Sequence, residues 1–354
     1  MKILAIETSC DETAAAVVEN TSILSSVKFT QTSHAEFGGV VPSLAKRDHE
    51  VKIDEIIQKA IVNCKLKIEN LDAIAVTAGP GLAIALEVGI SKAKELAIKF
   101  NKPLIAVNHI EGHLLSPLAS PNFQFSIFNF QKPVLGLIVS GGHTELILIE
   151  KIGKYKILAQ TLDDALGEAL DKAARILDMP YPGGALLEKA AALGNPKKYL
   201  LPLPMAGKEN RNELSYSGLK AAFARLVSAQ KKILSTQEIN DLAASFQNRA
   251  FEHLIRVIKK SIEHFSLSTE YLLVGGGVIA NTELRKRLGL MGNDLGIEVY
   301  FAPMELTGDN AAMIGIAASF KFTKKQFVTD FDSLDRLPRW RIDQELFYYP
   351  PQSN

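Results

Sequence analysis

The chain has 354 residues, of which 47% are hydrophobic and 22% are charged, and its formal net charge is +1. This ordinary globular balance excludes a disordered chain, and the length is enough for two domains. The near-neutral charge argues weakly against a large nucleic-acid surface, although a local basic patch can still bind phosphates. The candidates for such a patch are Lys197, Lys198, Lys208 and Arg211, and separately Arg285, Lys286 and Arg287. For both groups we favour a solvated face.

Two cysteines, Cys10 and Cys64, are too few for a disulfide framework or a zinc ribbon, which fits a reducing compartment. The short apolar run at residues 1–6 ends at Glu7, which predicts a first strand and not a signal peptide. The longest uncharged stretch, residues 114–131, contains prolines and amides, so we expect no membrane span. A cytoplasmic protein is therefore predicted.

A strand, a polar turn and a returning strand occur twice in the sequence. The first copy covers residues 2–18 and the second covers 134–149, where the turn is Gly141-Gly142-His143-Thr144. A third strand is expected after each pair, near 23–29 and near 154–158. This duplication predicts two related lobes, each opening with an antiparallel hairpin whose turn faces a shared cleft.

Helices and strands alternate through the rest of the chain, which predicts an α/β fold whose sheets are covered by helices. Helices are expected at 42–62, 82–100, from His109, at 166–177, 185–193 and 217–226, from Ser235, from about Asn281 and at 309–320, and strands at 72–77, 104–107 and 270–274. Ser217 is expected to cap its helix, and Ser235 to Glu238 to form a capping box. The core face of the helix after Ser235 is expected at Ile239, Leu242, Phe246, Leu254 and Val257.

The element order also predicts the domain boundaries. We expect an N-terminal lobe of residues 1–131 plus about 309–325, a C-terminal lobe of 132–308, and an irregular tail of 326–354. The chain contains no low-complexity linker, so we expect the lobes to pack as one unit.

His109 and His113 are the first candidate for a functional site, because imidazoles four residues apart lie on one face of a helix. Asp309, in a distant Gly-Asp-Asn segment, would complete a set of two histidines and one carboxylate with open positions for substrate. Such a pair can equally be structural. Glu111 lies two residues from each histidine and should point away from them, which argues against a peptidase mechanism of the zincin type.

Three glycine-rich turns are the second candidate. They are Ser140 to His143, Gly183-Gly184 and Gly275 to Gly277. One such turn is only a tight turn, but three in one lobe suggest a nucleotide cleft that differs from P-loop and Rossmann sites.

Each carboxylate near these turns has more than one possible role. Asp11 and Glu12 in the first turn could orient water or bind a metal-bridged phosphate, or could simply face solvent. Asp171 and Glu188 could hold ribose hydroxyls, although helical surface carboxylates usually have no specific role.

Nine short segments in this order resemble the tRNA N6-adenosine threonylcarbamoyltransferase family in its bacterial form. They are Glu7 to Thr13, Gly38 to Pro42, Gly79 to Leu82, His109 to His113, Ser140 to Thr144, Tyr181 to Gly184, Ser217 to Lys220, Gly275 to Asn281 and Gly308 to Asn310. The resemblance spans residues 3 to about 320 and implies a two-lobed actin-like fold, with duplicated mixed sheets around a central nucleotide cleft.

The resemblance implies transfer of the threonylcarbamoyl group from threonylcarbamoyl-adenylate to N6 of the adenosine beside the anticodon, with release of AMP, in tRNAs reading codons that begin with A. It places the metal on His109, His113 and Asp309. It places substrate contacts at Val139, Ser140, Gly141, Gly142, His143, Asp171, Gly184, Glu188 and Asn281. For proton removal from the attacking amine, the candidates are Asp11 and Glu12.

The resemblance also implies cofactors and partners. The metal would be one divalent ion, iron(II) or alternatively zinc(II), and the cleft would take the adenylate or ATP, ADP or AMP. The expected partners are tRNA, a shorter non-catalytic paralogue, a small P-loop ATPase and a separate synthase that supplies the adenylate. Residues 83–87 depart from the family pattern by placing Glu87 in the helix where the paralogue is expected to dock.

Three alternatives to the transferase are considered. A metallopeptidase is an older label for this family, and the position of Glu111 argues against it. A non-catalytic scaffold is less favoured because His109, His113 and Asp309 are all present. A small-molecule kinase of the same fold would need a conventional acceptor-sugar site.

Overall fold

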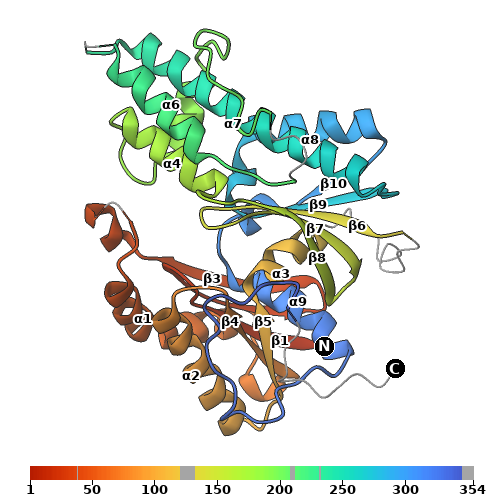
Figure 1. Ribbon diagram of the computed structural model, residues 1–354. Coiled ribbons are helices and arrows are strands. Elements are labelled where there is room, and N and C mark those ends of the chain that lie inside the picture. The colour runs from red at the N-terminus through yellow and green to blue at the C-terminus, as the bar shows by residue number, and fades with distance from the viewer. Residues whose placement is uncertain (38, 120–131, 208–211, 231–232, 345–354) are drawn as a thin grey trace. The chain divides into compact units, whose positions relative to one another are not determined.

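The computed structural model describes residues 1–37, 39–119, 132–207, 212–230 and 233–344 (Figure 1). Lys208 and Arg211 of the basic candidates lie outside the described residues, as do residues 120–131 of the long uncharged stretch and residues 345–354 of the tail. Among the described helices, none has both the length and the apolar character needed to cross a bilayer.

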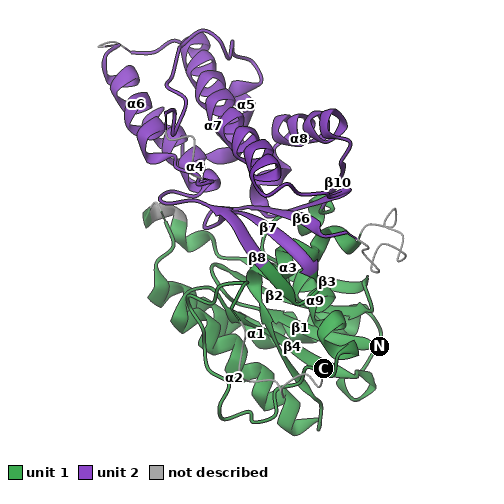
Figure 2. Cartoon of the chain, turned by 45° about the vertical axis from the view of Figure 1, so that its right-hand side comes forward, with its two compact units in different colours: residues 1–129, 151–155, 302–354 green, residues 130–150, 156–301 purple. Residues whose placement is uncertain are grey.

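The chain divides into two compact units (Figure 2). Unit 1 comprises residues 1–129, 151–155 and 302–354, and unit 2 comprises residues 130–150 and 156–301. Unit 1 is therefore built from both ends of the chain, whereas most of unit 2 comes from its middle.

The sheet of unit 1 has five strands in the order β3-β2-β1-β4-β5. These strands are β1 (Lys2–Glu7), β2 (Glu12–Glu19), β3 (Ser22–Thr30), β4 (Ala73–Gly79) and β5 (Leu104–Asn108). β1 pairs antiparallel with β2 and parallel with β4, and β4 pairs parallel with β5. Every residue of β4 and β5 is buried, which explains why both are continuous apolar runs in the sequence.

Helices cover both faces of this sheet. They are α1 (Pro42–Asn63), α2 (Ala83–Lys99), α3 (His109–Leu115) and α9 (Ala311–Thr323). Leu4 and Ile6 belong to the core that α1 and α2 fill. Ala5 instead faces α9, where a Cβ added at Gly315 would lie 3.4 Å from the Ala5 side chain. Because successive strand residues point to opposite faces, α9 lies on the face opposite α1 and α2.

The second sheet repeats this plan in the order β8-β7-β6-β9-β10. Its strands are β6 (Val134–Val139), β7 (Thr144–Lys151), β8 (Lys154–Gln160), β9 (Tyr271–Gly275) and β10 (Glu298–Phe301). β6 pairs antiparallel with β7 and parallel with β9, and β9 pairs parallel with β10. The two sheets thus share strand order and direction, and the predicted duplication is confirmed. β10 was not predicted from the sequence.

Unit 2 also contains most of the helical residues that follow the second hairpin. Its helices are α4 (Leu166–Ile176), α5 (Gly184–Ala191), α6 (Ser217–Ser228), α7 (Thr236–His264) and α8 (Thr282–Leu295). Short 3-10 helices of the chain are η1 (Thr32–Phe37), η2 (Ile68–Asn70), η3 (Ser116–Ala119), η5 (Gly277–Ala280) and η6 (Met304–Leu306).

The two helix caps predicted in unit 2, those of α7 and α6, have different outcomes. The capping box of α7 is confirmed, since Ser235 Oγ accepts from the Glu238 backbone and Glu238 Oε2 accepts from the Ser235 backbone. The prediction that Ser217 caps α6 is wrong. Ser217 is already the first residue of α6, and its hydroxyl donates to Asp163, whose Oδ1 accepts from the backbone of Tyr216 and Ser217. A distant carboxylate therefore replaces the local cap.

One residue of the expected core face of α7 also differs. Leu242, Phe246, Leu254 and Val257 are buried, but Ile239 is only half-buried in the first turn of the helix.

Residues after α9 complete the core of unit 1, although no helix or strand follows α9 in the described part of the tail. Val328, Leu334 and Trp340 are buried in the same cluster as residues of β1, α1 and α2. The backbone N–H of Leu337 donates to the carbonyl of Ala78 over 2.7 Å. Glycine is required at position 79, because a Cβ there would lie 1.9 Å from the Leu337 carbonyl oxygen.

The variant Leu334→Ala should lower the free energy of unfolding by about 2–4 kcal/mol, because truncation of a buried leucine leaves a cavity. The only tryptophan of the chain is Trp340, so its fluorescence during urea denaturation reports on the packing of the tail. The matched control is Leu200→Ala, since the Leu200 side chain is 89% exposed and that of Leu334 only 2%. Equal unfolding midpoints for the two variants would contradict this assignment of the tail to the core.

A candidate metal centre and a glycine-lined pocket

The two histidines lie on α3, directly after β5. Asn108 ends β5 and caps α3, since its Oδ1 accepts from the backbone N–H groups of Ile110 at 2.8 Å and Glu111 at 3.2 Å. The helix therefore starts at the carboxyl end of a parallel strand, which is where sites gather in α/β folds. His109 is 7% exposed and His113 is fully buried.

Asp309 approaches the histidines from the loop before α9. Its Oδ1 lies 3.0 Å from His113 Nε2 and 3.5 Å from His109 Nε2. One ligand atom from each residue lies within 4.8 Å of the other two. The structure thus brings together the three residues predicted as ligands, all of them in unit 1.

Gly112 allows α3 and α9 to approach closely beside this cluster. A Cβ on Gly112 would lie 2.9 Å from the Cδ1 atom of Ile314 and 3.2 Å from the Cγ atom of Met313. At the start of α9, Asn310 Oδ1 accepts from the Met313 backbone at 2.8 Å and caps the helix. The close contact and the cap together place Asp309 next to α3.

Glu7 was not predicted as a site residue, yet it contacts His109 directly. Its Oε2 lies 3.1 Å from His109 Nδ1 and accepts from Thr77 Oγ1 at 2.6 Å, and its Oε1 accepts from the Ser9 backbone at 2.5 Å. Burial acts to raise the pKa of Glu7, but His109 lowers it below the usual range. A carboxylate that binds one ring nitrogen of a histidine leaves the other nitrogen to face a metal.

The charges of the cluster attract a cation. Burial opposes a charge on His109, but Asp309 and Glu7 raise its pKa to about 9. Burial also opposes a charge on Asp309, yet His109 and His113 hold the pKa of Asp309 below its usual range. The carboxylates of Glu7, which is buried, and of Asp309, whose side chain is 22% exposed, therefore favour positive charge at a position lined by imidazole nitrogens.

Glu12 lies near this cluster at the start of β2, with Lys28 Nζ at 4.0 Å. Burial, together with Asp309 and Asp11, raises the pKa of Glu12 to about 9. A carboxyl group with a raised pKa keeps its proton to higher pH, which favours the role of a proton donor over that of a base. Asp11 is half-buried beside it.

Glu111 is buried, and both of its oxygens are occupied. Oε1 accepts from the hydroxyl of Tyr155 at 2.8 Å, and Oε2 lies 3.0 Å from Lys321 Nζ. These contacts agree with the expectation that Glu111 points away from the two histidines, and they leave it unsuited to act as a peptidase base.

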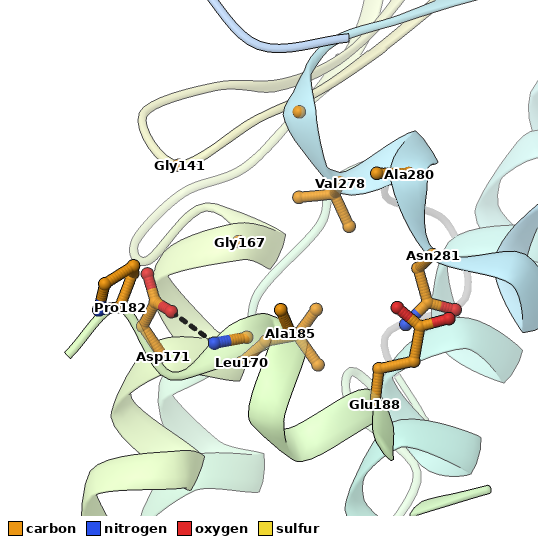
Figure 3. Close-up of a pocket in the computed structure, with 12 residues that line it drawn as sticks. Gly141, Gly167, Leu170, Asp171, Pro182, Ala185, Glu188, Val278, Ala280 and Asn281 are labelled. Carbon is orange, nitrogen blue, oxygen red and sulfur yellow. Dashed lines mark hydrogen bonds between the residues drawn. The ribbon is translucent and has the colours of Figure 1, made fainter. Parts of the chain in front are cut away.

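A pocket of about 250 Å³ lies in unit 2 (Figure 3). Its lining residues are Gly141, Gly167, Leu170, Asp171, Pro182, Gly184, Ala185, Glu188, Gly277, Val278, Ala280 and Asn281. Sites for drug-sized ligands span roughly 300–1,000 Å³, so this volume suits one part of a nucleotide. Among the predicted substrate contacts, five line the pocket, namely Gly141, Asp171, Gly184, Glu188 and Asn281, whereas Val139, Ser140, Gly142 and His143 do not.

The polar residues of the pocket also hold its helices. Asp171 Oδ1 accepts from the Gly184 backbone at 2.6 Å, as the dashed line in Figure 3 shows, and so binds the first residue of α5. Asn281 Oδ1 accepts from the Leu284 backbone at 3.0 Å and caps α8. Glu188 Oε1 accepts from the Thr282 backbone at 2.8 Å, next to that cap. The residues predicted to bind substrate therefore also fix the pocket walls.

The Ser140 turn is closed by its own hydrogen bonds. The Ser140 backbone donates to the His143 carbonyl at 2.8 Å, and the His143 backbone donates to Ser140 Oγ at 3.0 Å. No described heavy atom lies within 4 Å of a Cβ added at Gly141 or Gly142. Gly276 packs against the adjoining strand end, where a Cβ would lie 2.4 Å from the Val139 carbonyl oxygen.

Known proteins are similar to this chain over almost its whole length. The sequence profile described as tRNA N6-adenosine threonylcarbamoyltransferase matches residues 22–316. A Pelagibacter ubique protein with that name is 45% identical over 98% of this chain and 96% of its own length. The chain belongs to the tRNA N6-adenosine threonylcarbamoyltransferase family. An Acaryochloris marina member is 43% identical over 99% of this chain and 96% of its own length. The chain is thus a tRNA-modifying transferase.

Solved structures show that this family member has the predicted two-lobed, actin-like α/β fold. HypF from T. kodakarensis matches with a TM-score of 0.60 at 15% identity, over 91% of this chain and 48% of HypF. Full-length HypF in a phosphate- and nucleotide-bound form matches with a TM-score of 0.57 at 13% identity, over 91% of this chain and 46% of that protein. The chain spans about half the length of these proteins, and the likeness concerns the fold alone.

In this transferase, Asn281→Ala should lower the free energy of unfolding by about 1 kcal/mol, because it removes the cap of α8. Asn281→Asp should restore most of that loss, since aspartate caps as well as asparagine does. It should not restore the second contact, in which Asn281 Nδ2 donates to Gln247 Oε1 at 2.8 Å. Urea denaturation checks the order of stability, and equal losses for the two variants would argue against capping.

Proposed function

We propose that this transferase moves the threonylcarbamoyl group from L-threonylcarbamoyl-adenylate to N6 of the adenosine beside the anticodon, in tRNAs reading codons that begin with A. The bond from N6 to the carbamoyl carbon forms, the bond from that carbon to the phosphate oxygen breaks, and AMP leaves. Family membership supports this reaction, and the cluster of His109, His113 and Asp309 is the observation on which its metal dependence rests.

The residues of the cluster fit a divalent metal. Two imidazoles and one carboxylate are a donor set that iron(II) takes in many enzymes, and zinc(II) accepts the same donors, so iron(II) is proposed and zinc(II) is the alternative. Glu7 supports the fit, because its contact with His109 Nδ1 leaves Nε2 on the side of Asp309. A metal bound there would act as a Lewis acid that stabilises negative charge on the adenylate.

The pocket of unit 2 is proposed to bind the adenylate. Gly141 and Gly142 are exposed, and their backbone N–H groups would bind the phosphate or the threonyl carboxylate. Asp171 and Glu188 would accept from ribose hydroxyls, and Asn281 would lie against the nucleoside. Because the carbamoyl carbon is already activated, placement of the weakly nucleophilic amine supplies most of the acceleration.

We assign removal of the proton from the attacking amine to Asp11 or Glu12. Glu12, with its pKa raised to about 9 by burial and by Asp309 and Asp11, is a poor base even with Lys28 Nζ at 4.0 Å. The variants Asp11→Asn and Glu12→Gln therefore test the two candidate groups separately.

The proposal includes partners and a location. The proposed partners are tRNA, a shorter non-catalytic paralogue, a small P-loop ATPase and the synthase that makes the adenylate, and the proposed location is the cytoplasm. A peptidase activity is less favoured because Glu111 is already bound by Tyr155 and Lys321, and a scaffold role is less favoured because the three candidate ligands lie together.

Replacing His109 and His113 by alanine should remove both metal and activity, because two of the three candidate donors are lost. Elemental analysis should show a loss of metal, and mass spectrometry of tRNA nucleosides should show no threonylcarbamoyladenosine after a reaction with the adenylate and the partner proteins. The control is His264→Ala, since His264 is exposed at the end of α7. Unchanged modification by the double variant would remove the metal from the mechanism.

Gly141→Val should weaken AMP binding at least about tenfold without loss of stability. The new side chain would enter the pocket, where no described atom lies within 4 Å of the added Cβ. Calorimetric titration with AMP measures the affinity, and thermal unfolding measures the stability. Gly218→Ala is the control, because the space at its Cβ is equally open but it lies on α6 and not in the pocket. Equal AMP affinity for both variants would place the nucleotide elsewhere.

A further inference from the structure

We propose that Glu111, Lys321 and Tyr155 form a positioning network that holds the two metal-bearing segments of this transferase in register. The inference rests on the proposed function in one respect, namely that His109, His113 and Asp309 bind a divalent cation. The three residues of the network act through α3 and α9.

Glu111 is the centre of the network and lies on α3 between the two histidines. Residues two apart on a helix point in different directions, so Glu111 can contact another part of unit 1 while the histidines face Asp309. Its side chain is only 4% exposed, and it accepts from Tyr155 at 2.8 Å through Oε1. Its other oxygen, Oε2, faces Lys321 Nζ at 3.0 Å.

Lys321 brings the network to α9, the helix that starts just after Asp309. It lies in the last turn of α9, and its side chain is 9% exposed. The ion pair therefore joins the helix that carries two candidate ligands to the helix that follows the third. Tyr155, which also belongs to unit 1, occupies the remaining oxygen of Glu111.

The ion pair and the close contact at Gly112 constrain the helices in different ways. At Gly112, contact with Ile314 sets how near α3 comes to α9. The contact at Gly112 involves Met313 and Ile314 in the first turn of α9, whereas Lys321 lies in the last turn, so the ion pair holds α9 to α3 at a second, separate point. A metal site needs this control, because its ligands must be held within about 0.5 Å of their working positions.

A buried ion pair is a weak source of stability, since the loss of hydration offsets most of the attraction. A buried ion pair can instead select one arrangement of the elements that it joins. Both oxygens of Glu111 have partners, so its charge is not left without compensation. Positioning therefore explains the pair better than stability does.

The test compares cobalt(II) binding by the purified full-length chain and its variants, followed by visible absorption. Glu111→Gln/Lys321→Met removes both charges together, so that no unpaired charge is buried, and the glutamine can still accept from Tyr155. Its affinity for cobalt(II) should fall at least about tenfold, because the segments that carry the three donors lose the link that holds them in place, and its absorption bands should shift. Lys321→Arg keeps the charge and should stay within about threefold of the wild type.

Two controls make the result specific. Lys92→Met removes two other ion pairs of unit 1, in which a lysine whose side chain is 17% exposed binds Asp54 at 3.0 Å and Glu95 at 2.5 Å, and it should leave cobalt(II) binding unchanged. His113→Ala should abolish specific binding. Thermal unfolding of the metal-free proteins shows how much each variant changes stability alone.

Each outcome has a distinct meaning. Wild-type affinity and bands in Glu111→Gln/Lys321→Met would overturn the positioning network, even if its metal-free form unfolds at a lower temperature. Failure of the wild type to bind cobalt(II), or equal binding by His113→Ala, would overturn the proposed metal centre and the inference with it. Weaker binding by the double variant with retention in Lys321→Arg and Lys92→Met would support the network.

Discussion

The buried carboxylate of Glu7 is the interaction on which the candidate metal centre depends. It ends β1 and contacts Thr77 on β4 and His109 on α3, so three elements meet at one side chain. A buried charge is costly unless it is hydrogen-bonded, and each oxygen of Glu7 has a partner. Because Glu7 Oε2 and Ser9 Oγ each lie 3.1 Å from Nδ1 of His109, the ring presents Nε2 to Asp309. The position of Glu7 thus determines which face of His109 is available for chemistry.

The two units share one strand topology but carry different side chains at their strand ends. In unit 1, the buried Glu7 at the end of the central strand lies against His109, which follows β5, and this arrangement favours a cation. In unit 2, the matching turn after β6 consists mainly of glycines, and the polar side chains nearby cap helices as well as line the pocket. Since HypF has a similar fold at 15% identity, the fold alone does not specify this activity. The activity depends instead on the side chains at these strand ends.

Local patterns explain how far the sequence could predict this structure. The spacing of His109 and His113 and the capping box at Ser235 depend on neighbours in the chain, so both could be predicted from the sequence. The role of Glu7 was not, because its partner His109 is 102 residues away, although a charged residue ending an apolar strand was a signal. The cap of α6 was missed for the same reason, since it comes from Asp163. β10 was missed because a strand of four residues produces little periodicity.

Unit 1 is interrupted in the chain by unit 2, and this sets an order of events on the ribosome. His113 is made 196 residues before Asp309. At about 5–20 residues per second, the histidines wait roughly 10–40 s for their carboxylate. Throughout that interval the nascent chain offers two imidazoles and no third donor, and the core of unit 1 still lacks α9 and Trp340. The proposed cation would therefore be captured late in biogenesis, after translation of all the residues that line the pocket of unit 2.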